Sequence, residues 1–298
     1  IRVVDAAGRA ATDMRTVMLD TTPPRGAGTS PAEGAVVTGT TVAVMGTVSD
    51  ANPPATLSVN GQSVPLSAGG QFSVEVPLPL TQTTVTVAAI DRAGNAASVT
   101  RRVVRDATPP SITIVSPVAG FLTNQPSMPV SGTVTDAGAI AEVTVNGQPA
   151  TLTGTTFIAT VILAEGANIV NVTARDAAGN SGTASAGGTL DTRPPTLTLA
   201  AAPPDPTNSR TLALSVSATD AVTPADQIQF AFSLDSETGY GSYAAVSTAS
   251  FDVTADGPHT IRIKARDQAG NESPALAVIV RVNTVPPAVT IGAPTPAF

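Results

Sequence analysis

Asp176-Ala177-Ala178-Gly179-Asn180 decides the fold, because the chain repeats this stretch. Asp91-Arg92-Ala93-Gly94-Asn95 and Asp267-Gln268-Ala269-Gly270-Asn271 are further copies, and Asp5-Ala6-Ala7-Gly8-Arg9 is a diverged fourth copy. The leading aspartates are 86, 85 and 91 residues apart, and a Pro-Pro pair follows each of them after 18 or 19 residues. A self-similar period of this length indicates an array of small domains.

The copies divide the chain into three complete repeats and two partial ones. We expect domains at residues 21–106, 107–191 and 192–283, called below the first, second and third repeat. Residues 1–20 match the C-terminal strands of a truncated domain, and residues 284–298 match the first strand of a further one. Neither segment can bury an apolar face alone, so we expect residues 1–20 and 288–298 to be poorly packed unless something partners them. The sequence is thus predicted to be a window on a longer array.

Composition favours short strands over helices and narrows the classes of function. Val, Ala, Thr, Gly and Pro are plentiful, Trp is absent, and no long segment has apolar residues at helical spacing. The net charge is −7 and the 15 basic residues are scattered, which leaves no basic surface for nucleic acid. No apolar run approaches the ~20 residues that span a bilayer. Without cysteine, neither disulfides nor thiolate metal sites can form.

Alternating apolar residues predict similar strands in every repeat. Asn60-Gly61 and Asn146-Gly147 predict tight hairpin turns of type I′, whereas the third repeat has the longer segment 232–240 at this place. Six to seven short strands in each repeat are typical of an immunoglobulin-like β-sandwich. The predicted fold is therefore all-β, with tandem immunoglobulin-like sandwiches in an extended array. One phenylalanine per repeat is expected in the core: Phe72, Phe157 and Phe251.

One part of the second repeat resembles a known family. Glu165-Gly166-Ala167-Asn168, followed by Val172-Thr173-Ala174-Arg175-Asp176-Ala177-Ala178-Gly179-Asn180, is similar to the bacterial immunoglobulin-like modules first described in glucodextranase. Related modules recur in giant bacterial surface adhesins and in other secreted proteins. The resemblance is close over the first two repeats and looser over the third outside residues 258–287. It implies an extracellular or cell-surface location and a type of module, but no activity.

No set of residues in the sequence indicates catalysis. His259 is the only histidine, and we interpret it as a solvated strand residue without a partner for a metal site or a nucleophilic triad. Tyr240 and Tyr243 are the only tyrosines, which argues against a cleft that stacks sugar rings. We therefore expect a chain that is not an enzyme and that uses no cofactor other than calcium.

Aspartates recur in threes at places that the fold should bring together. In an immunoglobulin-like sandwich, the loops after the second and sixth strands lie at one end, where the linker from the preceding domain also enters. Three gathered carboxylates repel one another unless they are protonated, separated or bridged by a cation, and Ca²⁺ takes such oxygen ligands. The candidate interdomain calcium ligands are Asp20, Asp50 and Asp91; Asp106, Asp136 and Asp176 with Asn180; and Asp191, Asp220 and Asp267.

Turn chemistry offers a simpler interpretation of the same aspartates. An aspartate can accept hydrogen bonds from its own turn, glycine supplies a positive φ, and asparagine tolerates the left-handed region. The Asp-x-Ala-Gly-Asn turn would then need no metal, although the linker and second-strand aspartates are harder to explain in this way. Both interpretations stay open. If calcium binds, the second trio is the best candidate, because the repeats on both sides of it are complete.

Three functions fit these observations. The leading one is a non-catalytic stalk or fibre segment of a long secreted or cell-surface bacterial protein, adhesin-like or filamentous, because Pro-Pro linkers act as stiff spacers. The alternative is a set of accessory modules of a secreted carbohydrate-active enzyme. In a third, the modules themselves bind a surface ligand or self-assemble. The expected partners are therefore neighbouring repeats of the same chain, with no nucleic acid and no membrane span in this segment.

Overall fold

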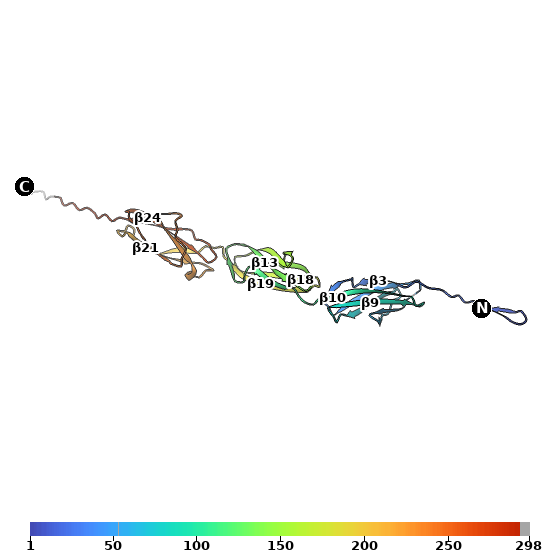
Figure 1. Ribbon diagram of the computed structural model, residues 1–298. Helices are drawn as coiled ribbons and strands as arrows, with labels where there is room; N and C mark the ends of the chain where they lie inside the picture. The colour runs from blue at the N-terminus through green and yellow to red at the C-terminus, as the bar shows by residue number, and fades with distance from the viewer. Residues whose placement is uncertain (53, 293–298) are drawn as a thin grey trace, which may run out of the picture. The chain divides into compact units, whose positions relative to one another are not determined.

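The structure is a computed structural model that describes residues 1–52 and 54–292, and nearly all of its regular elements are strands (Figure 1). The one helical element in this described part is a short 3₁₀ turn, Ala225–Gln227. No helix in the same part is long and apolar enough to cross a membrane. The chain forms two compact units: unit 1 comprises Ile1–Ser111, Thr135–Glu142 and Ala174–Gly182, and unit 2 comprises the rest. The division into three domains at the expected boundaries stays a prediction.

In unit 1, the first repeat forms two sheets that enclose a single core. The smaller sheet has the strand order β3-β5-β8, and the larger has the order β4-β10-β9-β6-β7. Val44 and Phe72 from the smaller sheet and Leu57 and Val85 from the larger one are buried in the shared core. The strands are β3 (Arg25–Ser30), β4 (Ala35–Val37), β5 (Thr41–Ser49), β6 (Pro54–Val59), β7 (Gln62–Ser63), β8 (Gln71–Pro77), β9 (Gln82–Asp91) and β10 (Ala96–Arg105).

The second repeat forms a four-stranded sheet in the order β11-β13-β17-β16 and a five-stranded sheet in the order β12-β19-β18-β14-β15. Phe157, Val170 and Val172 are completely buried. The strands are β11 (Ser111–Ser116), β12 (Phe121–Thr123), β13 (Ser127–Thr135), β14 (Ile140–Val145), β15 (Gln148–Pro149), β16 (Thr151–Thr153), β17 (Thr156–Ile162), β18 (Gly166–Asp176) and β19 (Ser181–Leu190).

The third repeat lies in unit 2 and has two three-stranded sheets, β20-β21-β23 and β22-β24-β25. Leu212 from one sheet and Phe230, Ile261 and Val280 from the other belong to one buried cluster. The strands are β20 (Thr196–Ala201), β21 (Thr211–Thr219), β22 (Gln229–Leu234), β23 (Thr248–Asp252), β24 (Gly257–Arg266) and β25 (Leu276–Val282). The chain is therefore an all-β protein of tandem immunoglobulin-like sandwiches, as its sequence predicts.

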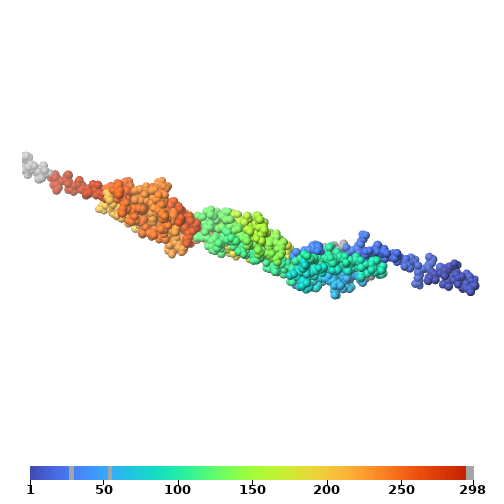
Figure 2. All heavy atoms as spheres, in the orientation of Figure 1, coloured from blue at the N-terminus to red at the C-terminus, as the bar shows by residue number. Residues whose placement is uncertain are grey.

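Residues 1–20 and 284–292 contain little packed structure. β1 (Arg2–Val4) and β2 (Ala10–Thr12) form an exposed hairpin, coloured dark blue in Figure 2. Residues 284–292 form no strand, and residues 293–298, where the rest of the expected terminal strand falls, lie outside the described residues. A single strand without a sheet to pair with has no partner for its backbone hydrogen bonds, so the absence of a strand at residues 284–292 is physically reasonable.

The turn predictions are confirmed, and the core prediction is confirmed for two of three repeats. Asn60 and Asn146 both have φ near +49°, and the glycine after each also has positive φ, as a type I′ turn requires. Phe72 and Phe157 are 6% and 0% exposed. Phe251 is only partly buried and packs against the core of the third repeat, whereas Phe230 from the facing sheet belongs to the buried cluster.

Candidate metal centres

The structure brings each expected trio of aspartates together. Within a trio, each residue offers a carboxylate oxygen, and these oxygens all lie within 4.8 Å of one another. Two of the trios lie within unit 1 and one lies within unit 2. They are called below the first cluster (Asp20, Asp50 and Asp91), the second cluster (Asp106, Asp136 and Asp176) and the third cluster (Asp191, Asp220 and Asp267).

The asparagine that ends the Asp-x-Ala-Gly-Asn motif makes the same contacts in all three clusters. In the third cluster, Asp267 Oδ1 accepts a hydrogen bond from the backbone N–H of Asn271, and Asp267 Oδ2 accepts one from Asn271 Nδ2, both at 2.8 Å. The same Nδ2 donates to the carbonyl oxygen of Asp191 at 2.8 Å. This asparagine therefore stabilises the turn and also bonds it to the linker. The bond from its Nδ2 to the linker carbonyl is called below the clip. The corresponding carbonyl contacts are Asn95 with Asp20 and Asn180 with Asp106, both at 3.1 Å.

Asn180 was expected near the second cluster as an oxygen ligand. It lies there, but its Nδ2 atom donates to Asp176 Oδ2 at 2.7 Å and to the carbonyl oxygen of Asp106 at 3.1 Å. Since both partners can only accept, the amide nitrogen must be the atom that faces them. Asn180 therefore positions Asp176 and the linker.

Turn chemistry explains the contacts of one oxygen, Oδ1, in each linker aspartate and each second-strand aspartate. Oδ1 of Asp191 accepts the N–H of Arg193 at 3.1 Å, and Oδ1 of Asp220 accepts those of Val222 and Thr223 at 2.8 Å. Such bonds to the backbone two or three residues onward are ordinary in turns. Their counterparts are Thr22 to Asp20, Asn52 to Asp50, Thr108 to Asp106 and Gly138 to Asp136.

The diverged copy at Asp5 shows that this turn needs no acidic neighbours. Asp5 Oδ1 accepts the N–H groups of Ala7 and Arg9, both at 2.9 Å. Arg9 Nε donates to Asp5 Oδ2 at 2.8 Å and so replaces the asparagine amide of the other copies. The turn by itself therefore does not indicate a bound cation. The carboxylate oxygens that the turns do not use, such as Oδ2 of the linker aspartates, are the ones that could bind a cation.

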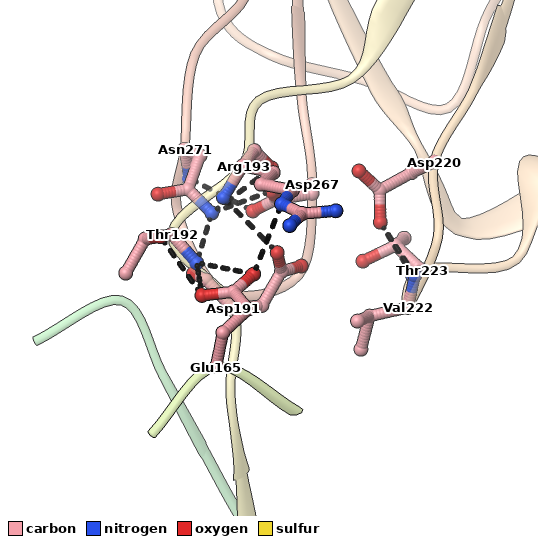
Figure 3. Close-up of polar contacts among 9 residues, drawn as sticks. All are labelled: Glu165, Asp191, Thr192, Arg193, Asp220, Val222, Thr223, Asp267 and Asn271. Atoms are coloured by element: carbon pink, nitrogen blue, oxygen red, sulfur yellow. Dashed lines mark hydrogen bonds and ion pairs between the residues drawn. The ribbon is translucent and has the colours of Figure 1, made fainter. Parts of the chain in front are cut away.

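The clusters differ at Oδ2 of the linker aspartate. In the first cluster, Asn52 Nδ2 donates to Asp20 Oδ2 at 2.7 Å. In the third, Asp191 is 1% exposed, and its Oδ2 has no hydrogen-bond partner among the residues that the structure describes. Figure 3 shows Asp220 pointing toward this carboxylate from the loop that also carries Val222.

The second cluster has glycine where the first has Asn52. A Cβ atom on Gly138 would lie only 2.8 Å from Asp106 Oδ2 and 3.4 Å from Asp136 Oδ1, so a side chain here would crowd the cluster. Position 138 follows Asp136 by two residues, as Asn52 follows Asp50. The second cluster therefore has no side-chain donor at this position.

The carboxylate pKa values follow these contacts. Hydrogen bonds from Asn52, and then from Thr22, lower the pKa of Asp20. Burial raises the pKa of Asp191, and the neighbouring charges of Asp220 and Asp267 raise it further, against the opposing hydrogen bond from Arg193. An anionic oxygen beside other anions, without a donor, is disfavoured in its charged form. The charged form of Asp20 is thus stabilised by an amide donor in the first cluster, whereas Asp191 in the third cluster has no such donor to its Oδ2 among the described residues.

Four residues of these sites are not predicted as site residues from the sequence. Asn95 and Asn271 occupy the same motif position as Asn180, so the repeat itself was a signal for them. Asn52 and Glu165 have no repeated signal. Glu165 Oε2 accepts a hydrogen bond from Thr192 Oγ1 at 2.8 Å, and its carboxylate adds to the negative potential at Asp191.

The interpretation of His259 as a solvated residue is wrong. Its side chain is 12% exposed, and Nδ1 lies 2.7 Å from Asp235 Oδ2. Asp235 has φ of +52° and exchanges backbone and carboxylate hydrogen bonds with Thr260, just as Asn60 does with its neighbouring strand. Nε2 of His259 lies 3.1 Å from the carbonyl oxygen of Ala255, where a triad would need a nucleophile.

The paired sheets and repeated turns define a protein of tandem immunoglobulin-like modules. The family model described as "Glucodextranase, domain B" matches residues 24–107 and 110–191, which together make up more than half of the chain. The chain belongs to this family. The match confirms the resemblance over the first two repeats, and residues 192–283 lie outside it.

Several solved structures are similar to the chain at low TM-scores. Fibronectin(III)-like modules of Clostridium thermocellum CbhA have 21% identity, 58% coverage of this chain and 94% of theirs, and a TM-score of 0.38. Titin domains A168–A170 have 10% identity, coverages of 86% and 98%, and a TM-score of 0.38. A tetra-tandem repeat from the extending region of a large adhesion protein has 24% identity, coverages of 95% and 80%, and a TM-score of 0.34. Such scores add nothing to the family assignment. No curated protein matches the chain.

Proposed function

We propose that this chain is a non-catalytic structural segment, a stalk or fibre, of a long secreted or cell-surface repeat protein. The observation that carries the proposal is the clip found at all three linkers. Asn95, Asn180 and Asn271 each donate to the carbonyl oxygen of the aspartate that begins a linker. A Pro-Pro pair then restricts the backbone a few residues later. Restricting the linker repeatedly is useful where the direction from one module to the next matters.

Small-angle scattering on the 298-residue chain tests this role. A compact globule of this length would have a radius of gyration of about 19 Å, and a stalk would exceed this value clearly. The matched comparison is the triple variant Asn95→Ala, Asn180→Ala and Asn271→Ala, which removes the clips but leaves the proline pairs. We expect a broader distribution of dimensions for the variant. A wild-type chain as compact as a globule contradicts the proposal.

Within this role, the three clusters are proposed calcium sites. Calcium takes 6–8 oxygen ligands at flexible geometry, and carboxylates with water can supply them. Extracellular modules bind calcium at roughly 10⁻⁴–10⁻³ M, so about 2 mM calcium would stabilise the folded chain by roughly 0.7–1.8 kcal/mol per site. Thermal unfolding in chelator and in calcium measures this effect. Identical curves would refute calcium binding without touching the stalk proposal.

An accessory role in a secreted carbohydrate-active enzyme is the second candidate, favoured by the name of the matching family. Each tyrosine ring has a cationic side chain beside it: Lys264 Nζ lies 5.2 Å from the centroid of the Tyr240 ring, and Arg266 Cζ lies 4.2 Å from that of Tyr243. Affinity electrophoresis in soluble glucans distinguishes the roles. Retardation that is lost in Tyr243→Ala would favour the accessory role; unchanged mobility would favour the stalk.

Secretion and cell-surface exposure belong to both candidates, and the proposed partners are the neighbouring repeats of the same chain. Self-assembly or binding of a surface ligand is the third candidate. Analytical ultracentrifugation of the chain over a wide concentration range would reveal self-assembly, since a chain that acts only through its neighbours should stay monomeric.

A further inference from the structure

We propose that the three clusters are not equivalent: the third binds a divalent cation most tightly, and in the first the side chain of Asn52 takes the place of the cation. The inference rests on the calcium binding proposed above and assigns an order to the sites. The sequence favours the second cluster as the strongest site, whereas the structure favours the third.

Among the residues that the structure describes, one acceptor of the third cluster has no donor. Asp191 Oδ2 is buried and unpaired, although buried polar atoms in folded proteins nearly always have a hydrogen-bond partner. Carboxylate oxygens of Asp191, Asp220 and Asp267 lie within 4.8 Å of one another, and each can only accept when ionised. A divalent cation can bind an oxygen of each of these three carboxylates at once and would give the unpaired Asp191 Oδ2 a partner.

In the part of the chain that the structure describes, no basic side chain forms an ion pair with Asp191, Asp220 or Asp267. Arg193 is the basic residue beside the linker, but its Nε lies 3.7 Å from Glu165 Oε1. Its backbone N–H is used by Asp191 Oδ1, which leaves Oδ2 unchanged. Glu165 brings a fourth carboxylate close enough to raise the pKa of Asp191. The local charge therefore favours a divalent ion.

In the first cluster, Asn52 already joins two of the carboxylates. Its Nδ2 donates to Asp20 Oδ2 at 2.7 Å, and its backbone N–H donates to Asp50 Oδ1 at 2.8 Å. One residue thus bridges the linker aspartate and the second-strand aspartate, which is the connection that a cation would make. A cation entering this cluster must displace the amide, so its binding is weaker.

The second cluster should be intermediate. Gly138 donates its backbone N–H to Asp136 Oδ1 at 2.7 Å but has no side chain to reach Asp106. The cluster therefore lacks the competing amide of the first. Asp106 is half-buried, whereas Asp191 is fully buried, so water can serve Asp106 more easily in the absence of an ion.

Exchanging one side chain between clusters tests the proposal. Val222 occupies in the third cluster the position that Asn52 occupies in the first, and both N–H groups bond their aspartate at 2.8 Å. We expect Val222→Asn to weaken calcium binding at the third cluster about tenfold and Asn52→Val to strengthen it at the first by a similar factor. Val246→Asn, at an exposed valine in the same repeat as Val222, is the matched control and should change neither site.

Calcium titrations followed by amide NMR resolve the sites separately, because each linker aspartate accepts one backbone N–H that can serve as a reporter: Thr22, Thr108 or Arg193. The expected order of apparent Kd is third below second below first. Well-dispersed spectra show that each variant is folded. If calcium shifts none of the reporter signals, both calcium binding and this inference are refuted. The stalk proposal is tested separately, by scattering. Equal Kd values, or exchanges without effect, overturn the inference alone.

Discussion

The first and third clusters are built from the same parts but satisfy their carboxylates differently. Both have a linker aspartate, a second-strand aspartate and a turn aspartate held by an asparagine. In the first, Asn52 supplies a donor to Asp20, whereas Asp191 in the third keeps a buried oxygen without one. The repeated residues therefore determine where the carboxylates gather. Asn52, which is not repeated, determines whether Oδ2 of the linker aspartate has a hydrogen-bond donor.

The hairpin turns of the same two repeats show a parallel difference. Asn60 in the first repeat and Asp235 in the third have the same left-handed backbone and the same bonds to the neighbouring strand. The aspartate has a second oxygen, which pairs with His259. In both places the third repeat has a carboxylate oxygen that accepts no bond from an amide side chain: Asp235 Oδ2 pairs with His259, and we propose that Asp191 Oδ2 binds a cation.

The largest expected effect concerns the cores of these two repeats. Truncation of a buried phenylalanine costs about 3–5 kcal/mol, so Phe72→Ala and Phe230→Ala should each lower the free energy of unfolding of their repeat by this amount. Phe251→Ala should cost less than half as much, because the ring is only partly buried. Denaturant unfolding followed by repeat-specific NMR signals measures all three. Equal costs for Phe230 and Phe251 would mean that the core assignment is wrong.

The stabilising effect expected for Asp191→Asn in chelator should be mostly lost in calcium. In chelator the variant removes a buried unpaired charge and offers a donor to the neighbouring carboxylates, which should stabilise the chain by about 1–2 kcal/mol. At about 2 mM calcium it loses a ligand and should forfeit roughly 0.7–1.8 kcal/mol of cation stabilisation. Thermal unfolding in both buffers measures the difference.

Asp20→Asn is the matched control in the first cluster. Its Oδ2 already accepts from Asn52, so an amide nitrogen there would face another donor. We expect destabilisation in chelator and in calcium alike. A stabilised Asp20→Asn, or an Asp191→Asn that behaves the same way in both buffers, would remove the distinction between the clusters.

The spacing of the aspartates was sufficient to predict which nine residues meet. They follow strands and linkers at nearly constant intervals, and a sandwich brings those positions to one end. The contacts of Asn52 and Glu165 could not be predicted in this way, since they join residues 32 and 27 positions apart and occur in one repeat each. Strand and turn patterns were likewise repeated, whereas the burial of Phe230 in place of Phe251 depends on packing between sheets, which no spacing reveals.

The asparagine clips should have equal energetic effects in the two repeats. Asn95→Ala and Asn271→Ala each remove bonds to a turn aspartate and to a linker carbonyl. We expect a loss of about 1–2 kcal/mol for each, with little dependence on calcium, because the bond to the linker carbonyl uses none of the carboxylate oxygens proposed to bind calcium. Chemical denaturation in chelator measures both values. A difference of more than about 1 kcal/mol between them would mean that the clips are not equivalent.

The smallest expected effect is the pH dependence of the third repeat. The hydrogen bond to Asp235, with a smaller contribution from the Ala255 carbonyl, raises the pKa of His259. A raised folded-state pKa means that the stabilisation is fully present below the unfolded value of about 6.5 and is lost as pH rises through the folded value. The pair is near the surface, so the loss between pH 5 and pH 8 should be about 0.5 kcal/mol.

Asp235→Asn supplies the control that the chain itself offers, since it restores the asparagine of the first two repeats and can keep both bonds to Thr260. Thermal unfolding of the third repeat, followed by its own NMR signals from pH 5 to pH 8, should show a falling midpoint for the wild type and a smaller change for Asp235→Asn. His259→Gln should match Asp235→Asn, because either change removes the charged pair while leaving the left-handed turn in place. A pH dependence that survives in both variants would belong to other groups, and the comparison of Asn60 with Asp235 would then explain only the shape of the turn.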